Sequence, residues 1–139
     1  MFVVVGEFQS QLESSYLDVT GHFSPGQLPS ILSKLGAGVG FLPSIWPETY
    51  SYVLSEYYRH GLHPVVFDIG AQSERVKASG YGTVLPMHID APAINDALLK
   101  IKTDLAPRRP PTGLPDKDYV DACYGSLLLD IKVARSGSN

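Results

Sequence analysis

Short apolar runs alternate with helical patterns along the first hundred residues. The apolar run from Phe2 to Val5 predicts a buried strand that ends at Gly6. Four more strands are predicted at 16–20, 39–42, 64–67 and 83–85. This alternation favours an α/β fold, a Rossmann-like parallel sheet with helices on both faces. The strand side chains expected to be buried are Val3, Val5, Val39, Phe41, Val65 and Phe67.

Helices are predicted between and after these strands. Ser24-Pro25-Gly26-Gln27 is a helix start with Ser24 as N-cap, and Gly36 ends that helix. The second helix is expected to open at Glu48, the third to span 72–79, and the fourth to be capped by Asp90. Their apolar stripes are Leu28, Ile31, Leu32 and Leu35; Tyr50, Val53, Leu54, Tyr57 and Tyr58; and Ile94, Ala97, Leu98 and Ile101.

The pattern changes after residue 103. Residues 104–116 contain four prolines and Arg108-Arg109, which predicts a surface linker. A last helix is predicted over 117–132, with Cys123 on its apolar face, followed by a tail over 133–139. The expected organisation is therefore one domain over 1–103, a linker, a helix and a tail.

Composition narrows the class of protein. The 139 residues are 44% hydrophobic and 18% charged, which indicates one globular domain. The net charge of −3 provides no basic field, so nucleic acid is not an expected partner. A single cysteine permits no disulfide within the chain and favours a reducing, cytoplasmic location. Phe2–Val5 is too short for a signal peptide or a membrane span.

Candidate chemistry gathers where the strands end. Ligands of parallel α/β sheets bind outside the carboxyl ends of the strands, which places 6–8, 21–24, 43–49 and 68–73 around one crevice. Glu48 lies in this set, and Glu56 follows eight positions later.

The spacing of the two glutamates argues against a glycosidase. On one helix they would lie about 12 Å apart along the axis, whereas retaining glycosidases hold their carboxyl groups about 5–5.5 Å apart. The pair could instead contact two parts of one long ligand, with a diphosphate on the free N–H groups of Thr49, Tyr50 and Ser51. The simpler alternative is a helix-start acid at Glu48 and a solvated surface acid at Glu56.

These residues resemble a known family. Pro43-Ser44, Glu48, Ser55-Glu56, Gly61 and Pro64-Val65-Val66 resemble the retaining GT-B glycosyltransferases of family four (group 1), whose hallmark is a pair of glutamates with seven residues between them. The segments Val19–Phe23 and Gly70–Arg75 resemble the flanking parts of the family pattern, so the similarity covers about residues 2–102. It implies the C-terminal, nucleotide-sugar-binding half of a transferase that synthesises bacterial surface polysaccharides or glycans and that, when intact, is peripheral to the inner membrane.

The resemblance assigns roles to individual residues. It implies that Glu48 contacts the transferred sugar as the catalytic residue and that Glu56 binds ribose hydroxyls. The other donor-binding residues that it implies are Thr49, Tyr50 and Ser51 near the sugar and diphosphate, and Gly21, His22 and Phe23 against the base. No metal and no cofactor is implied, since the nucleotide-diphosphate sugar is itself the donor substrate.

The chain departs from the family pattern in three ways. The family places an arginine and a lysine near the diphosphate, but residues 1–7 contain neither. The first strand and helix of the donor half and the N-terminal acceptor domain are expected partners outside this chain, so the isolated chain is expected to be inactive. A second copy could cover the exposed cleft face. Tyr57 and Tyr58 also stand where the family has small residues.

Other readings remain open. The first is a non-catalytic relic or assembly domain of the same fold that binds nucleotide or a partner subunit. The second is an NAD-binding dehydrogenase or epimerase, but only Gly6 follows the first strand, and the glycines at 36–40 open a strand instead of following one. His60 and His63 are weak evidence for a metal site, because no third ligand stands near them. Trp46 is expected to be a packing residue or a loop anchor.

Overall fold

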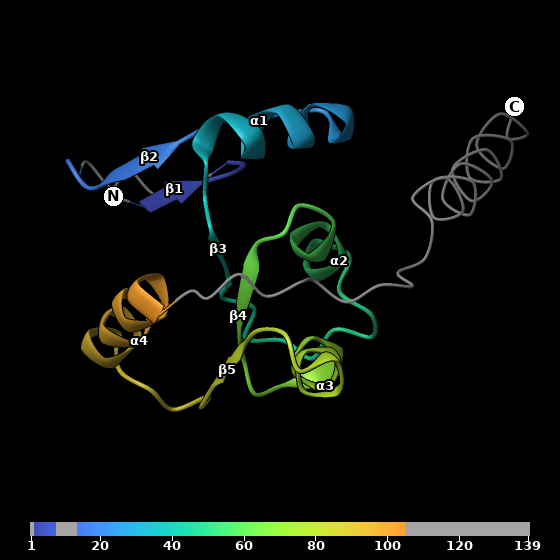
Figure 1. Ribbon diagram of the computed structural model, residues 1–139, viewed down its shortest axis with the longest axis vertical. Coiled ribbons are helices and arrows are strands. Elements are labelled where there is room, and N and C mark those ends of the chain that lie inside the picture. The colour runs from blue at the N-terminus through green and yellow to red at the C-terminus, as the bar shows by residue number, and fades with distance from the viewer. Residues whose placement is uncertain (1, 8–13, 105–139) are drawn as a thin grey trace, which may run out of the picture.

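The computed structural model describes residues 2–7 and 14–104, within which strands and helices alternate (Figure 1). In chain order the elements are β1 (Phe2–Val4), β2 (Leu17–Val19), the 3-10 turn η1 (Pro25–Gln27), α1 (Leu28–Leu35), β3 (Val39–Leu42), α2 (Tyr52–Arg59), β4 (His63–Phe67), α3 (Gly70–Ser79), β5 (Thr83–Leu85) and α4 (Ala91–Asp104). Each strand pair in this part of the chain is parallel, which confirms the predicted α/β class. The predicted linker, the helix over 117–132 and Cys123 lie outside the described residues.

The five strands form two sheets. β1 pairs with β2, and β4 lies between β3 and β5. The single parallel sheet predicted from the sequence is therefore divided, and β1 and β2 lie outside the three-stranded sheet. β1 and β2 have only three residues each, which leaves a short ladder of hydrogen bonds with which to join a larger sheet.

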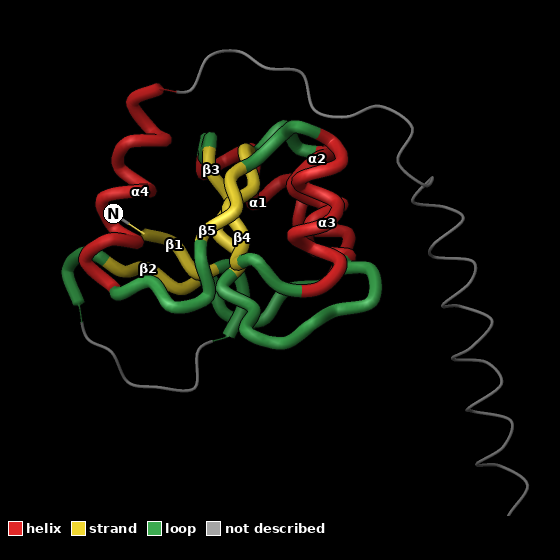
Figure 2. The backbone as a smooth tube through the Cα atoms, turned by 90° about the horizontal axis from the view of Figure 1, so that it is seen from below, coloured by secondary structure: helices red, strands yellow, loops and turns green. Residues whose placement is uncertain are grey.

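Helices cover both faces of the three-stranded sheet, as predicted. Figure 2 shows α2 and α3 on one side of the strands and α4 on the other. All five residues of β4 are buried. Val66 packs on one face with Leu54, Tyr58, Val76 and Tyr81, while Val65 and Phe67 pack on the other with Leu85 and Leu98. The two-residue alternation of a strand thus builds two small cores from one central element.

The predicted burial of the strand side chains is confirmed only in part. Val65 and Phe67 are buried, whereas Val3, Val5, Val39 and Phe41 are half-buried. β4 has a neighbour on each side, but β3 is an edge strand and β1 belongs to the small sheet. No described side chain before Gly40 is buried, so the tight core lies in the second half of the described chain.

The helix boundaries follow local signals, with one exception. The Gln27 side chain accepts a hydrogen bond from the Ser24 N–H at 2.8 Å, one half of the predicted capping box, although a 3-10 turn precedes α1. Asp90 accepts a hydrogen bond from the Ala93 N–H at 2.9 Å, as expected of an N-cap. The exception is α2, which begins at Tyr52 instead of Glu48.

A large side chain on α2 fits over a glycine on β3. A Cβ at Gly40 would lie 2.8 Å from ring carbons of Tyr57, so the ring occupies the space that the missing side chain leaves. The Tyr57 hydroxyl donates to the Phe41 carbonyl at 3.1 Å, and burial raises the pKa of Tyr57 to about 12. α2 therefore packs closely on the sheet although a tyrosine replaces the family's small residue.

This contact predicts a coupled pair of substitutions. Gly40→Ala should lower the free energy of unfolding by about 1–3 kcal/mol, because the ring must move. In a Tyr57→Ala background the same substitution should cost much less, and urea unfolding of the four proteins measures the coupling. Gly26→Ala is the control, since its added Cβ meets nothing within 4 Å. Equal costs of Gly40→Ala in both backgrounds would contradict the contact.

Candidate functional site

Two of the predicted crevice segments lie together at the carboxyl ends of β3 and β4. Residues 43–51, the Glu48 loop, follow β3, and the start of α3 follows β4. The Ala71 N–H donates to the Glu48 carbonyl at 2.9 Å, which joins the two segments directly. The third segment, Gly21 to Phe23, follows β2 in the other sheet, and no hydrogen bond between described residues links it to the Glu48 loop.

Side chains of α3 hold the backbone of the Glu48 loop. Gln72 donates from Nε2 to the Trp46 carbonyl at 3.1 Å. Arg75 donates from Nη1 to the carbonyls of Tyr50 and Ser51 at 2.7 and 2.8 Å. With the Ala71 N–H on the Glu48 carbonyl, α3 binds four carbonyl groups of this loop. The loop therefore has a defined path without belonging to a strand or a helix.

Gly70 lets the loop approach α3 closely. Its φ is +58°, and a Cβ there would lie 2.8 Å from the Glu48 nitrogen and 2.8 Å from the Pro47 Cα. Any other residue would both strain the backbone and displace the loop. The glycine-containing turn that the sequence pointed to thus has a physical function next to Glu48.

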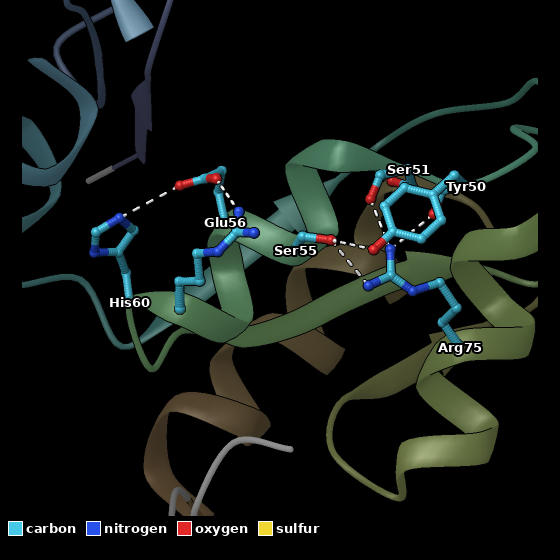
Figure 3. Close-up of polar contacts among 7 residues, drawn as sticks. Tyr50, Ser51, Ser55, Glu56, His60 and Arg75 are labelled. Carbon is cyan, nitrogen blue, oxygen red and sulfur yellow. Dashed lines mark hydrogen bonds and ion pairs between the residues drawn. The ribbon is translucent and has the colours of Figure 1, made fainter. Parts of the chain in front are cut away.

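Arg75 is the organising residue that the sequence did not single out. In addition to its two carbonyl partners it donates from Nη2 to the Ser55 hydroxyl at 2.9 Å, and its guanidinium lies 4.3 Å from the centroid of the Tyr50 ring (Figure 3). The planar, branched guanidinium can reach these groups together, which a lysine could not. The one signal in the sequence was its position a helical turn after Gln72, on the same face of α3.

Glu48 has a fixed backbone and an unengaged carboxylate. Its carbonyl is bound by Ala71, and its nitrogen lies against Gly70. The side chain is half-buried, and no hydrogen bond or ion pair to its carboxylate occurs among residues 2–7 and 14–104. A carboxylate in this state can accept hydrogen bonds from the hydroxyl groups of a ligand.

The predicted helix start at Glu48 is wrong for a clear reason. A helix that ran from Glu48 into α2 would have to pass through Ser51 with helical backbone angles. Ser51 has a φ of +65°, which lies outside the helical region, and its buried Oγ has no hydrogen-bond partner among the described residues. The N–H groups at the first turn of α2 belong to Tyr52, Val53 and Leu54, not to Thr49–Ser51.

Glu56 lies toward the other end of α2, away from Arg75 (Figure 3). Its carboxylate accepts from Arg59 Nη1 at 2.5 Å and lies 3.5 Å from His60 Nε2. Its side chain is only 22% exposed, so the alternative of a freely solvated acid is also wrong. Because α2 begins at Tyr52, Glu56 lies on this helix and Glu48 lies in the loop before it.

His63 and Trp46 differ in burial. His63 is buried, with Nε2 2.9 Å from the Thr83 hydroxyl, and no group of three potential metal ligands occurs in the described part of the chain. Trp46 is 75% exposed, so the expectation of a packed ring is wrong. Its carbonyl, bound by Gln72 and by the Ser44 hydroxyl, does anchor the loop.

A hollow of about 230 Å³ opens elsewhere, between α1 and the end of α2. Its lining consists of Pro29, Leu32, Ser33, Ala37, His60 and Leu62. None of these residues belongs to the predicted donor site.

Comparisons with known proteins find no relative. No protein-family model matches the chain, and neither a curated protein nor a solved structure matches it significantly. Within residues 2–7 and 14–104, no helix combines the length and apolar character needed to cross a membrane.

The close approach at Gly70 predicts a specific steric effect. Gly70→Ala should displace residues 46–51 and cost about 1–3 kcal/mol beyond the backbone strain. Gly80→Ala is a matched control, because its φ is +63° but its added Cβ meets nothing within 4 Å, so it should show only the strain of roughly 1–2 kcal/mol. Urea unfolding and amide NMR shifts of residues 46–51 measure both effects. Identical results for the two glycines would disprove the steric role.

The contacts of Arg75 predict that charge alone cannot replace it. Arg75→Lys should lower the free energy of unfolding by about 1–3 kcal/mol and shift the amide signals of Tyr50 to Ser55, because the carbonyls lose their paired donors. Arg59→Lys is the comparison on α2: its side chain is 21% exposed and keeps a positive charge beside Glu56, so stability should change by about 0–1 kcal/mol. Unchanged signals at 50–55 in the Arg75→Lys protein would refute the role of the guanidinium.

Proposed function

We propose that this chain is the nucleotide-sugar-binding half of a retaining glycosyltransferase of the GT-B fold, active in bacterial glycan synthesis. One observation carries the proposal: Glu48 stands on a fixed backbone at the carboxyl ends of parallel strands, with an unengaged carboxylate. This is where open α/β sheets bind their ligands. The glutamate spacing and the Gly70 turn of the family pattern support the same site.

Glu48 would act on the transferred sugar. A carboxylate held by its backbone can accept hydrogen bonds from sugar hydroxyls without a reorganisation cost, and its negative charge stabilises the positive charge that develops at the anomeric carbon. Gly70 and Ala71 supply that rigidity, since both fix the main chain of Glu48. The proposed catalytic group is thus positioned by α3.

The diphosphate would lie at the first turn of α2. Tyr52, Val53 and Leu54 replace Thr49–Ser51 as the residues whose N–H groups begin the helix. Residues 35–58 contain no lysine or arginine, so positive charge near this turn must come from another part of the chain. Arg75 of α3 binds the carbonyls of Tyr50 and Ser51, just before the turn. Arg75 would supply part of the positive charge that the family's arginine and lysine provide.

Glu56 favours a second candidate function. Its carboxylate is engaged by Arg59 and lies near His60, so ribose hydroxyls would have to share or displace these partners. This observation supports a non-catalytic domain of the same fold that binds nucleotide or a partner subunit. Sugar transfer by the chain alone would eliminate that candidate.

NMR titration of the full chain with uridine, guanosine and adenosine diphosphates tests the proposal. Weak binding is expected, with shifts at 48–56 and, if the base reaches β2, at 21–24. The absence of two charge-assisted hydrogen bonds, each worth about 1.5–3 kcal/mol, lowers affinity by about a hundredfold or more. Tight binding, or shifts confined to other regions, would overturn the proposal.

Substitutions separate the two glutamates. Glu56→Ala should weaken binding of the nucleoside diphosphate, whereas Glu48→Ala should weaken only binding of the nucleotide-sugar and, in an intact enzyme, lower turnover more than binding. Glu74→Ala, which removes an exposed acid of α3, is the control and should change neither. If Glu56→Ala leaves nucleotide affinity unchanged, the ribose role of Glu56 is wrong and the non-catalytic candidate gains.

A further inference from the structure

Trp46 displays a large apolar ring on an immobilised backbone. The residue is 75% exposed, and its neighbour Ile45 is 59% exposed. Isolated apolar residues on a surface are ordinary. At Trp46, however, two side chains bind the carbonyl: Gln72 Nε2 at 3.1 Å and the Ser44 hydroxyl at 3.3 Å. The Trp46 ring is therefore exposed to solvent, while hydrogen bonds hold the main chain of the residue in place.

Polar acceptors accompany the ring along the chain. Glu48, with its unengaged carboxylate, follows two residues later, and the exposed Thr49 adds a hydroxyl. The carbonyls of Trp46, Glu48 and Tyr50 are all bound by groups of α3. Two residues of chain span at most about 7 Å, so the indole and the carboxylate start close enough for one sugar ring to reach both.

We propose that Trp46 is a stacking platform for a pyranose ring whose hydroxyl groups bind Glu48. One face of a pyranose carries C–H groups and suits the flat face of an indole, while the hydroxyls at its rim donate to a carboxylate. The inference goes beyond the proposed function because it needs no nucleotide. The ring can belong to a nucleotide-sugar donor or to a free saccharide, and the chemistry of contact is the same.

The surroundings favour a sugar over a membrane or a protein. An anionic lipid surface attracts basic residues, and residues 35–58 contain none. The core of a protein interface is depleted of charged residues, whereas Glu48 stands two positions from the ring.

The fluorescence of the full chain tests the platform, because Trp46 is its single tryptophan. Binding of a sugar ring should shift the emission to shorter wavelength and lower acrylamide quenching at least twofold. The ligands are uridine diphosphate, uridine diphosphate glucose, guanosine diphosphate mannose, and the free disaccharides maltose and cellobiose. A response to nucleotide-sugars only assigns the donor sugar, a response to free disaccharides assigns a saccharide acceptor, and either supports the proposal.

Variants test the contact by NMR titration, which does not need the tryptophan. Trp46→Ala should lower the affinity for the responding sugar at least tenfold, and Trp46→Phe should lower it less. Ile45→Ala, the matched control at the adjacent exposed residue, should change affinity less than twofold. The urea midpoint should stay the same in all three proteins, since these side chains are exposed.

Several results would overturn the proposal. One is an emission spectrum that no sugar-containing ligand changes up to its solubility limit. Another is the same spectral shift produced by phosphatidylcholine vesicles or by raising the protein concentration, which would assign the ring to a membrane or to a second copy. If nucleoside diphosphates bind at 48–56 but no sugar changes the tryptophan emission, the stacking role of Trp46 is wrong and the proposed function stands. If disaccharides change the emission but no nucleotide binds, the nucleotide-sugar function is wrong and the stacking role stands.

Discussion

The guanidinium of Arg75 fixes the arrangement on which the candidate site depends. It takes the carbonyls of Tyr50 and Ser51, the hydroxyl of Ser55 and the face of the Tyr50 ring. Its hydrogen-bond partners are neutral oxygens, so it retains its full positive charge beneath the first turn of α2. These contacts order the loop up to Ser51, whose φ of +65° lies outside the helical region, so α2 begins at Tyr52.

Rigidity in this region comes from α3 and not from the strand that leads into it. β3 is an edge strand with half-buried side chains, whereas α3 supplies Gln72, Arg75 and the Ala71 N–H to the loop. Gln72 is fully buried, and its Oε1 has no hydrogen-bond partner among the described residues. An unsatisfied buried oxygen costs free energy, so the hydrogen bond from Nε2 to the Trp46 carbonyl is made at a cost in stability.

Sequence patterns predicted the class, the parallel pairing and the burial of Val65 and Phe67 in β4, because continuous apolar runs and capping residues are local signals. They could not predict that β1 and β2 form a separate sheet, since strand partners are chosen by long-range packing. The start of α2 was missed because the φ of +65° at Ser51, which is not a glycine, has no local signal in the sequence. Glu48 was found from its motif, but the exposure of Trp46 depends on tertiary contacts that no spacing encodes.

The meaning of the glutamate pair changes with the true helix boundary. Only residues 52–56 of the interval between Glu48 and Glu56 are helical, about one turn, and the rest is loop held by α3. The distance between the two carboxylates is therefore set by where α3 holds the loop, and not by the pitch of α2. α3, which carries neither glutamate, therefore determines where Glu48 lies relative to the helix that carries Glu56.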